Sequence, residues 1–260
     1  MLEIPTAACG RSLTRHALGG FVLAASLGGS AYGGCSGVPI EGGVVAQVID
    51  GRSFRLTDGR EIVLMGIEAP QDQQTLAAEL LGNTVDLRRV GHGTDRYGRI
   101  SAFASRPGSS ITIQHKLLAD GAAQVSSRAG DRACTIELLT AEKIARRASL
   151  GLWGDPGYVI KRAESGGDLL AERGRFVIAE GKVLSVRESG GTLYMNFGRR
   201  WSQSLTVTVA KRHERVFGEA GLAPKSLERR DIRVRGWVEE RNGPRMEVSR
   251  PEQIEFADRE

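Results

Sequence analysis

The stretch VIDGRSFRLTDGREIVLMGIEAPQ, residues 48–71, contains three short apolar runs separated by two Asp-Gly pairs, Asp50-Gly51 and Asp58-Gly59. An Asp-Gly pair between apolar runs is a strong signal for a tight turn between antiparallel strands. We therefore predict a three-stranded meander. Its strands cover residues 44–49, 53–56 and 61–67.

The residues that follow this meander continue a β-rich unit. Leu76, Leu80 and Leu81 recur at helical spacing after Pro70, which predicts a helix. Further strands are predicted at residues 84–90 and 99–104, and further helices at residues 111–119 and 131–150. Five short strands with helices packed outside are typical of an OB-fold barrel.

The helix predicted at residues 131–150 has clear ends. Asp131 is a suitable N-cap, and Gly151 ends the helical pattern. The spacing assigns the following residues to its apolar face: Ile136, Leu139, Ile144 and Ala148.

The C-terminal part of the chain repeats this kind of pattern without repeating any sequence. Residues 158–172 are predicted as a linker, with a short helix at residues 168–173 as the alternative. Strands are predicted at residues 176–186, 192–197, 205–209, 232–238 and 246–248, with a helical interval at residues 211–220. This order predicts a second small OB-like barrel over residues 173–260, after a first domain at residues 43–157.

The N-terminus has the order of a secretory signal peptide. Basic residues precede an apolar run at residues 17–27, and small residues end it. We predict that residues 1–34 are removed and that the protein is exported. Gly33-Gly34-Cys35 is similar to a bacterial lipoprotein cleavage box, which makes Cys35 a candidate for lipidation and membrane attachment. Cys134 is then predicted to be a free buried thiol without a disulfide.

Composition excludes several classes of protein. The 260 residues include 36 Lys and Arg against 31 Asp and Glu, and 5% are aromatic, which fits one large or two small folded domains. Three scattered cysteines and four histidines exclude a disulfide scaffold or a zinc finger as the main organising element. Residues 44–158 carry 14 basic and 13 acidic residues, whereas residues 172–260 carry 18 and 14. The second half therefore holds most of the basic excess.

Five segments in order give the first unit a resemblance to a known family. They are VIDGRSFRL at residues 48–56, VLMGIEAPQ at 63–71, DRYGR at 95–99, LLADGAA at 117–123 and GLWGDP at 151–156. Residues 44–156 thereby resemble the thermonuclease family, the staphylococcal-nuclease-like OB-fold phosphodiesterases that use Ca²⁺. The fold class predicted is mainly β with helices, a nuclease-like barrel followed by a second OB-like barrel.

The resemblance also implies a set of catalytic positions, and most of them are substituted here. Active members have two Asp and a Thr that hold Ca²⁺, a Glu that acts as the base, and two Arg that bind the phosphate. At the Ca²⁺ positions this chain has Arg52, Glu68 and Ala69; Gln71 replaces the base and Val63 replaces the first Arg. Only Arg99 is retained.

These substitutions predict a loss of metal-dependent catalysis. Ca²⁺ binding depends on carboxylate charge, and the sum over the three acidic positions is zero instead of −3. An amide such as Gln71 is no general base near neutral pH. We therefore expect no metal cofactor, with Asp50 and Glu68 as weak candidate ligands only if an active site survives. Arg52 and Arg99 are candidates for a metal-free phosphate clamp.

The second unit resembles an extra barrel found after the nuclease domain in some bacterial members, and it offers a second candidate surface. Arg199, Arg200 and Trp201 combine cations with an aromatic side chain, as OB-folds do when they bind single strands. Tyr194 and Phe197 nearby are assigned to the core.

Three functions follow from these observations. The first is an exported, inactive nuclease homologue that binds nucleic acid, another polyanion or an envelope partner. The second is an active, Ca²⁺-dependent secreted nuclease with a metal shifted onto Asp50 and Glu68. The third is an envelope scaffold with no role in nucleic-acid binding. Fold analogy does not decide among them, because function is carried by the site.

Overall fold

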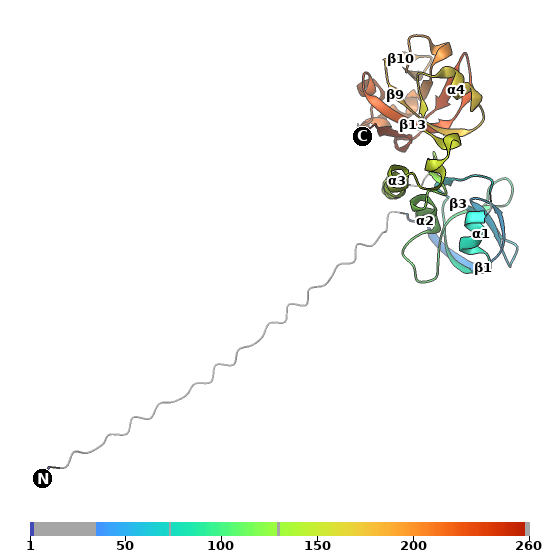
Figure 1. The fold of residues 1–260 in the computed structure, drawn as a ribbon, viewed down its shortest axis with the longest axis vertical. Coiled ribbons are helices and arrows are strands. Elements are labelled where there is room, and N and C mark those ends of the chain that lie inside the picture. Colours follow the sequence, from blue (N-terminus) through green and yellow to red (C-terminus); the bar gives the residue numbers. More distant parts are fainter. Residues whose placement is uncertain (3–34, 73, 129–130, 258–260) are drawn as a thin grey trace. The chain divides into compact units, whose positions relative to one another are not determined.

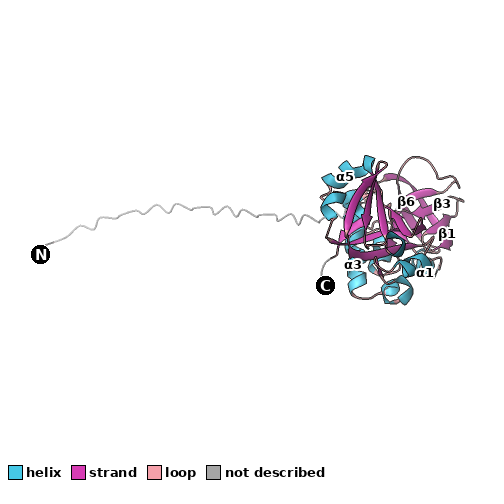
Figure 2. Ribbon diagram, turned by 90° about the horizontal axis from the view of Figure 1, so that it is seen from above, coloured by secondary structure: helices cyan, strands magenta, loops and turns pink. Residues whose placement is uncertain are grey.

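The computed structural model describes residues 1–2, 35–72, 74–128 and 131–257. The described residues from Cys35 onward belong to one compact unit, in which strands dominate (Figure 2). Nearly all of the predicted signal peptide lies outside the described residues, and so does Cys9. No helix in the described part of the chain has the length and apolar character needed to cross a bilayer.

The first half of the unit forms a closed five-stranded barrel in the order β1-β2-β3-β6-β5 (Figure 1). Its strands are β1 (Val38–Asp50), β2 (Ser53–Leu56), β3 (Glu61–Leu64), β5 (Thr84–Arg89) and β6 (Ile100–Ser105). The first Asp-Gly turn brings Asp50 opposite Ser53 in the antiparallel pair β1-β2, and β3 runs parallel to β6. The predicted barrel is confirmed.

A two-stranded ribbon that contains Glu68 follows β3 of this barrel. The strand predicted at residues 61–67 breaks after Leu64, and β4 (Ile67–Glu68) pairs instead with β7 (Gln124–Val125). Glu68 lies opposite Gln124 in this antiparallel pair.

Three helices accompany the barrel: α1 (Gln74–Leu80), α2 (Ile113–Ala119) and α3 (Arg132–Arg147). Leu76 and Leu80 of α1 are buried as predicted, whereas Leu81 is exposed because the helix ends before it. The side chain of Asp131 accepts a hydrogen bond from the Cys134 backbone N–H at 2.9 Å, which confirms it as the N-cap of α3.

The face of α3 that is buried differs from the prediction. Ile136 and Ile144 are 52% and 62% exposed, and Ala148 is also exposed. Leu139, the fourth member of the predicted face, is half-buried, and the helix buries a side that includes Glu142. The apolar spacing misassigned this face because a buried ion pair accommodates Glu142.

The second half contains two sheets around one core, and the predicted second barrel is not shown. One sheet has the order β16-β13-β9-β8 and the other the order β10-β11-β12-β15-β14. The strands are β8 (Lys161–Arg162), β9 (Phe176–Lys182), β10 (Ser185–Ser189), β11 (Thr192–Asn196), β12 (Thr206–Ala210), β13 (Asp231–Trp237), β14 (Glu239–Glu240), β15 (Pro244–Glu247) and β16 (Ile254–Phe256). Both sheets contribute to one cluster of buried apolar side chains, which includes Val234 and Met195.

A single predicted strand splits between these two sheets. The Val183 N–H donates to the carbonyl of Arg230 beside β13, and the Leu184 N–H donates to the carbonyl of Asn196 on β11. The chain therefore changes sheet between Val183 and Leu184, and the strand predicted at residues 176–186 becomes β9 and β10.

The predicted linker at residues 158–172 is ordered structure. It contains β8, which pairs parallel with β9, and α4 (Gly166–Ala171), close to the short helix given as the alternative. The helical interval at residues 211–220 contains η4 (Lys211–His213) and α5 (Glu214–Glu219). Further single turns are η1 (Gly151–Gly154), η2 (Pro156–Tyr158), η3 (Trp201–Gln203), η5 (Pro224–Leu227) and η6 (Pro251–Gln253).

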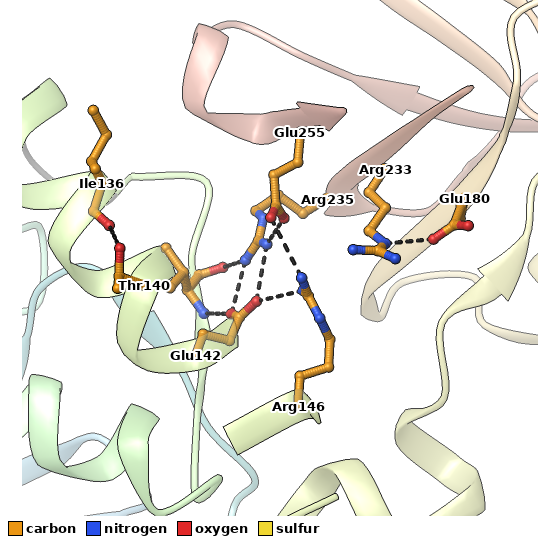
Figure 3. A network of polar contacts seen from close by, with 9 residues as sticks. Ile136, Thr140, Glu142, Arg146, Glu180, Arg233, Arg235 and Glu255 are labelled. Carbon is orange, nitrogen blue, oxygen red and sulfur yellow. Dashed lines mark hydrogen bonds and ion pairs between the residues drawn. The ribbon is translucent and has the colours of Figure 1, made fainter. Parts of the chain in front are cut away.

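A buried network of ion pairs joins the two halves (Figure 3). Arg235 of β13 donates to both carboxylate oxygens of Glu142 on α3, at 2.9 and 3.0 Å, and it also contacts Glu255 on β16. Arg146 contacts Glu142 at 3.2 Å and Glu255 at 3.6 Å. Two cations and two anions therefore meet, and the buried charge is balanced.

The same network holds β7. The carboxylate of Glu142 accepts the Val125 N–H at 2.5 Å, and Arg235 donates to the Val125 carbonyl at 3.1 Å. Burial alone would lower the pKa of Arg235, but Glu142 and Glu255 raise it above its usual range. The guanidinium is therefore charged, and it satisfies both acidic side chains and a buried carbonyl.

Candidate functional site

The loop that carries Arg52 is pressed against the segment that carries Glu68. Gly51 lies between β1 and β2, and a Cβ at this position would lie 2.2 Å from the carbonyl oxygen of Pro70. Only glycine fits there without moving the backbone. The Asp50 carboxylate accepts a hydrogen bond from the Arg52 N–H at 2.9 Å, which fixes the turn.

Arg52 forms an ion pair with Glu68 across this loop. The Nη1 atom of Arg52 lies 3.3 Å from Oε1 of Glu68 and 3.3 Å from the carbonyl oxygen of Ile67. The exposed fractions of the two side chains are 35% and 19%. Burial raises the pKa of Glu68, the Arg52 guanidinium opposes this, and the Asp50 carboxylate raises it further.

The other substituted positions that the family resemblance assigns to the catalytic site bring no charge to it. Val63 is half-buried in β3, opposite Ser53 of β2 and Ser101 of β6. Ala69 is half-buried against the barrel core, and Gln71 is exposed. Among the positions that the resemblance assigns to the site, together with Asp50, the carboxylates are therefore Asp50 and Glu68.

These residues do not fit a calcium ion. Ca²⁺ takes six to eight oxygen ligands, several of them carboxylates. Glu68 already has a guanidinium as its counterion, and no group of three or more His, Cys, Asp and Glu suited to a metal occurs among the residues that the structure describes. The Arg52 side chain supplies the positive charge that a metal would otherwise bring to Glu68.

The retained Arg99 belongs to a tight turn after β5. Asp95 accepts hydrogen bonds from the N–H groups of Tyr97 and Arg99 at 2.8 and 3.0 Å, and from the Arg99 side chain at 2.8 Å. These contacts with Arg99 and Tyr97 outweigh the effect of burial and lower the pKa of Asp95. Arg52 and Arg99 are thus each paired with a carboxylate, which opposes the predicted phosphate clamp.

The same turn presents an aromatic side chain that the sequence interpretation missed. Tyr97 is 66% exposed, and the guanidinium carbons of Arg96 and Arg99 lie 4.7 and 5.2 Å from its ring centroid. Arginine on both sides of a tyrosine in DRYGR is the signal that could have revealed this cation-π cluster.

Comparisons with known proteins agree with this barrel. A family model described as staphylococcal nuclease homologue matches residues 61–155. Protein ParB of Escherichia coli is 32% identical over 133 residues, which cover 45% of this chain and 75% of ParB. The chain belongs to the family of staphylococcal nuclease homologues. The predicted family is confirmed, and the span matched by the model contains Glu68, Gln71 and Arg99 but begins after Arg52.

The second candidate surface of this staphylococcal nuclease homologue lies after residue 155, where the matched span ends. Trp201 is 70% exposed at the start of η3, directly after the exposed Arg199 and Arg200. Phe197 is buried, as predicted, and Tyr194 is half-buried on β11. The aromatic side chain available at this surface is therefore Trp201.

The structure corrects the predictions for the cysteines of this homologue. Cys35 and Cys134 form a disulfide, 99 residues apart in the chain, that ties the segment before β1 to the first turn of α3. The Ser36 hydroxyl adds a hydrogen bond to Asp131 at 3.1 Å. Cys134 is thus not a free thiol. A sulfur in a disulfide also has no thiol left for lipid, so the disulfide opposes lipidation of Cys35.

Proposed function

We propose that this protein is an exported, catalytically inactive staphylococcal nuclease homologue that binds nucleic acid without cutting it. The observation that carries the first part is the ion pair between Arg52 and Glu68. A dication at this carboxylate would have to displace the guanidinium or lie beside it, and two cations about 4 Å apart in a partly buried site repel by several kcal/mol.

The other substitutions remove the remaining steps of metal-assisted hydrolysis. Gln71 has no proton-accepting group to activate water. Val63 cannot bind a phosphate oxygen or stabilise the charge that develops on it. Each group of this kind typically contributes orders of magnitude to the rate, and their joint absence supports the inactive assignment.

Nucleic-acid binding is supported by the surface of the nuclease unit. Domains of this family commonly bind nucleic acids, and Tyr97 offers an exposed aromatic ring beside the Arg96 guanidinium. Bases stack on such rings, and guanidinium groups attract phosphates.

Export is supported by two features of the chain. Residues 11–34 have the order of a signal peptide, and the disulfide between Cys35 and Cys134 is a bond that forms and persists mainly in oxidising compartments. A periplasmic or extracellular location would satisfy both.

The test is a cleavage assay on the full chain with its disulfide intact. Labelled single-stranded DNA is incubated with the protein in Ca²⁺ buffer and, in parallel, in EDTA, and cleavage is followed over hours. We expect intact DNA in both samples and a shift in its electrophoretic mobility on binding. Cleavage that EDTA abolishes would overturn the inactive assignment and support a metal held by Asp50 and Glu68. Intact DNA without any binding would instead favour a scaffold role.

A further inference from the structure

Backbone contacts hold the loop that carries Trp201 against its own half of the chain. The carbonyl oxygen of Arg200 accepts hydrogen bonds from the Gln203 N–H at 2.9 Å and from the Ser204 hydroxyl at 3.0 Å. On its other side the loop contacts the turn before β15. There Gly243 has a φ of 128°, and a Cβ on it would lie 2.4 Å from the Trp201 carbonyl oxygen.

This close approach brings a further arginine near the tryptophan. The Arg241 N–H donates to the Gly243 carbonyl at 2.9 Å, so Arg241 lies on the same tight turn that packs against Trp201. Arg241 is exposed, as are Arg199 and Arg200. The sequence pattern did not identify this residue, because 40 positions separate it from Trp201.

Among the described residues, no ion pair engages the three arginines of this surface, Arg199, Arg200 and Arg241. The segments at residues 198–206 and 241–246 contain no Asp or Glu, although the exposed Glu239 and Glu247 flank the second segment in the sequence. Nearby Glu240 is already paired with Arg173 at 2.8 Å. Elsewhere in this half, Lys211 and Lys225 are both paired with Glu188. The three arginines therefore form a local basic surface.

The tryptophan itself also lacks a partner within the described residues. The ring of Trp237 contacts Phe176 edge-on at 6.0 Å, and the ring of Trp153 lies under Arg146, with the guanidinium carbon 5.8 Å from its centroid. No such contact is found for Trp201, and this residue is 70% exposed. Its backbone is fixed while its ring is free, so a ligand that stacks on the ring meets a preorganised surface.

We propose that Trp201, Arg199, Arg200 and Arg241 form a second binding site, for single-stranded nucleic acid. A base stacks on the indole and neighbouring phosphates bind the guanidinium groups. A membrane or an apolar peptide fits less well, because Trp201 is the sole large apolar side chain exposed in these two segments. This inference rests on the proposed function and places part of its binding in the second half of the chain.

Fluorescence anisotropy of a labelled oligothymidylate tests the site on the full chain. We expect Trp201→Ala to weaken binding about tenfold or more, since a stacked base contributes on this scale, and Trp201→Phe to retain most of the affinity. Trp237→Ala is the matched control, because Trp237 is also partly exposed but packs on Phe176. Thermal unfolding of each variant establishes that it is folded.

Salt dependence tests the arginines. Replacement of Arg199, Arg200 and Arg241 by Ala should reduce the slope of log K against log salt by about 0.7 for each phosphate that an arginine no longer neutralises. Arg162→Ala is the control, because the Arg162 side chain is 82% exposed, lies on β8 of the other sheet and is already near Glu164 at 3.9 Å. With an abasic oligonucleotide of equal charge, Trp201→Ala should weaken binding far less than it does with oligothymidylate, because the abasic strand has no base to stack on the indole.

The outcomes separate this inference from the proposed function. If Tyr97→Ala abolishes binding and Trp201→Ala leaves it unchanged, the site at Trp201 is wrong while nucleic-acid binding stands. If heparin and the abasic strand bind as tightly as oligothymidylate, the surface recognises charge alone and the stacking role is wrong. If no strand binds, this inference and the binding part of the proposed function both fail. The Ca²⁺ and EDTA cleavage assay then still decides catalysis separately.

Discussion

Arg235 and Glu142 are 93 residues apart and form a two-point ion pair, with Nη–Oε distances of 2.9 and 3.0 Å, that is fully buried where the two halves of the chain meet. A buried ion pair typically adds little to the free energy of unfolding compared with an apolar contact of similar volume. Removal of one partner, however, leaves the other charge buried without a counterion. Replacement of either residue alone is therefore expected to destabilise the folded protein.

We predict that Arg235→Met lowers the free energy of unfolding by about 3–5 kcal/mol. The reason is that Glu142, Glu255 and the Val125 carbonyl all lose a donor. Guanidinium chloride unfolding followed by tryptophan fluorescence measures the change. Arg215→Met is the control, because its pair with Glu219 is exposed and should contribute less than about 1 kcal/mol. Equal stability of the two variants would contradict the buried network.

We predict a loss of stability in acid that depends on Glu255. Burial raises the pKa of this carboxyl, but Arg235 and Arg146 more than offset it and hold the pKa below its ordinary value of 4.5. A carboxyl with a lowered pKa in the folded state contributes stability above its unfolded pKa, and this is lost as the pH falls through the folded pKa. Thermal unfolding between about pH 3 and pH 6 should therefore show a steeper acid loss for the parent protein than for Glu255→Gln.

The control for this pH dependence is Glu252→Gln, three residues away on η6 and outside the network. It should keep the parent protein's slope. An unchanged slope in Glu255→Gln would show that other carboxyls cause the acid transition.

Local sequence signals predicted the first barrel well. The two Asp-Gly pairs each determine a turn within a few residues, and the alternation around them determines which side chains, such as Phe54 and Ile62, face the core. Asp131 identified the start of α3 for the same reason, since an N-cap acts on its own first turn.

Long-range contacts explain what the sequence did not predict. The buried face of α3 depends on Arg235, 93 residues later, which no helical periodicity can reveal. The disulfide depends on the spatial proximity of Cys35 and Cys134, and the division of one predicted strand between two sheets depends on the partners that Val183 and Leu184 find on β13 and β11. At the candidate site the substitutions were visible in the sequence, but the ion pair that connects Arg52 to Glu68 was not.

We predict that the disulfide contributes about 2–5 kcal/mol to stability, because it closes a loop of about 100 residues in the unfolded chain. Cys134→Ser should lower the free energy of unfolding by this amount, whereas Cys9→Ser in the full chain should not. Peptide mass spectrometry without reduction should find residues 35 and 134 in one cross-linked fragment. A mature protein that carries an acyl-modified Cys35 and a free Cys134 would contradict both the disulfide and the stability prediction.

We predict that calcium-dependent cleavage can be built into this barrel by five substitutions. Arg52→Asp replaces the cation beside Glu68 with a carboxylate. Glu68→Asp shortens the neighbouring carboxylate side chain, and Ala69→Thr adds a hydroxyl oxygen as a further ligand. Gln71→Glu supplies a base, and Val63→Arg supplies a ligand for the phosphate. Calorimetry should detect Ca²⁺ binding in the fivefold variant and none in the parent protein, and single-stranded DNA should be cut only without EDTA. The matched control omits Gln71→Glu and should bind Ca²⁺ while cleaving at least about a hundredfold more slowly. If the fivefold variant folds and still binds no Ca²⁺, the Arg52–Glu68 pair is not what excludes the metal, and the backbone of the loop at residues 50–52 is the next feature to test.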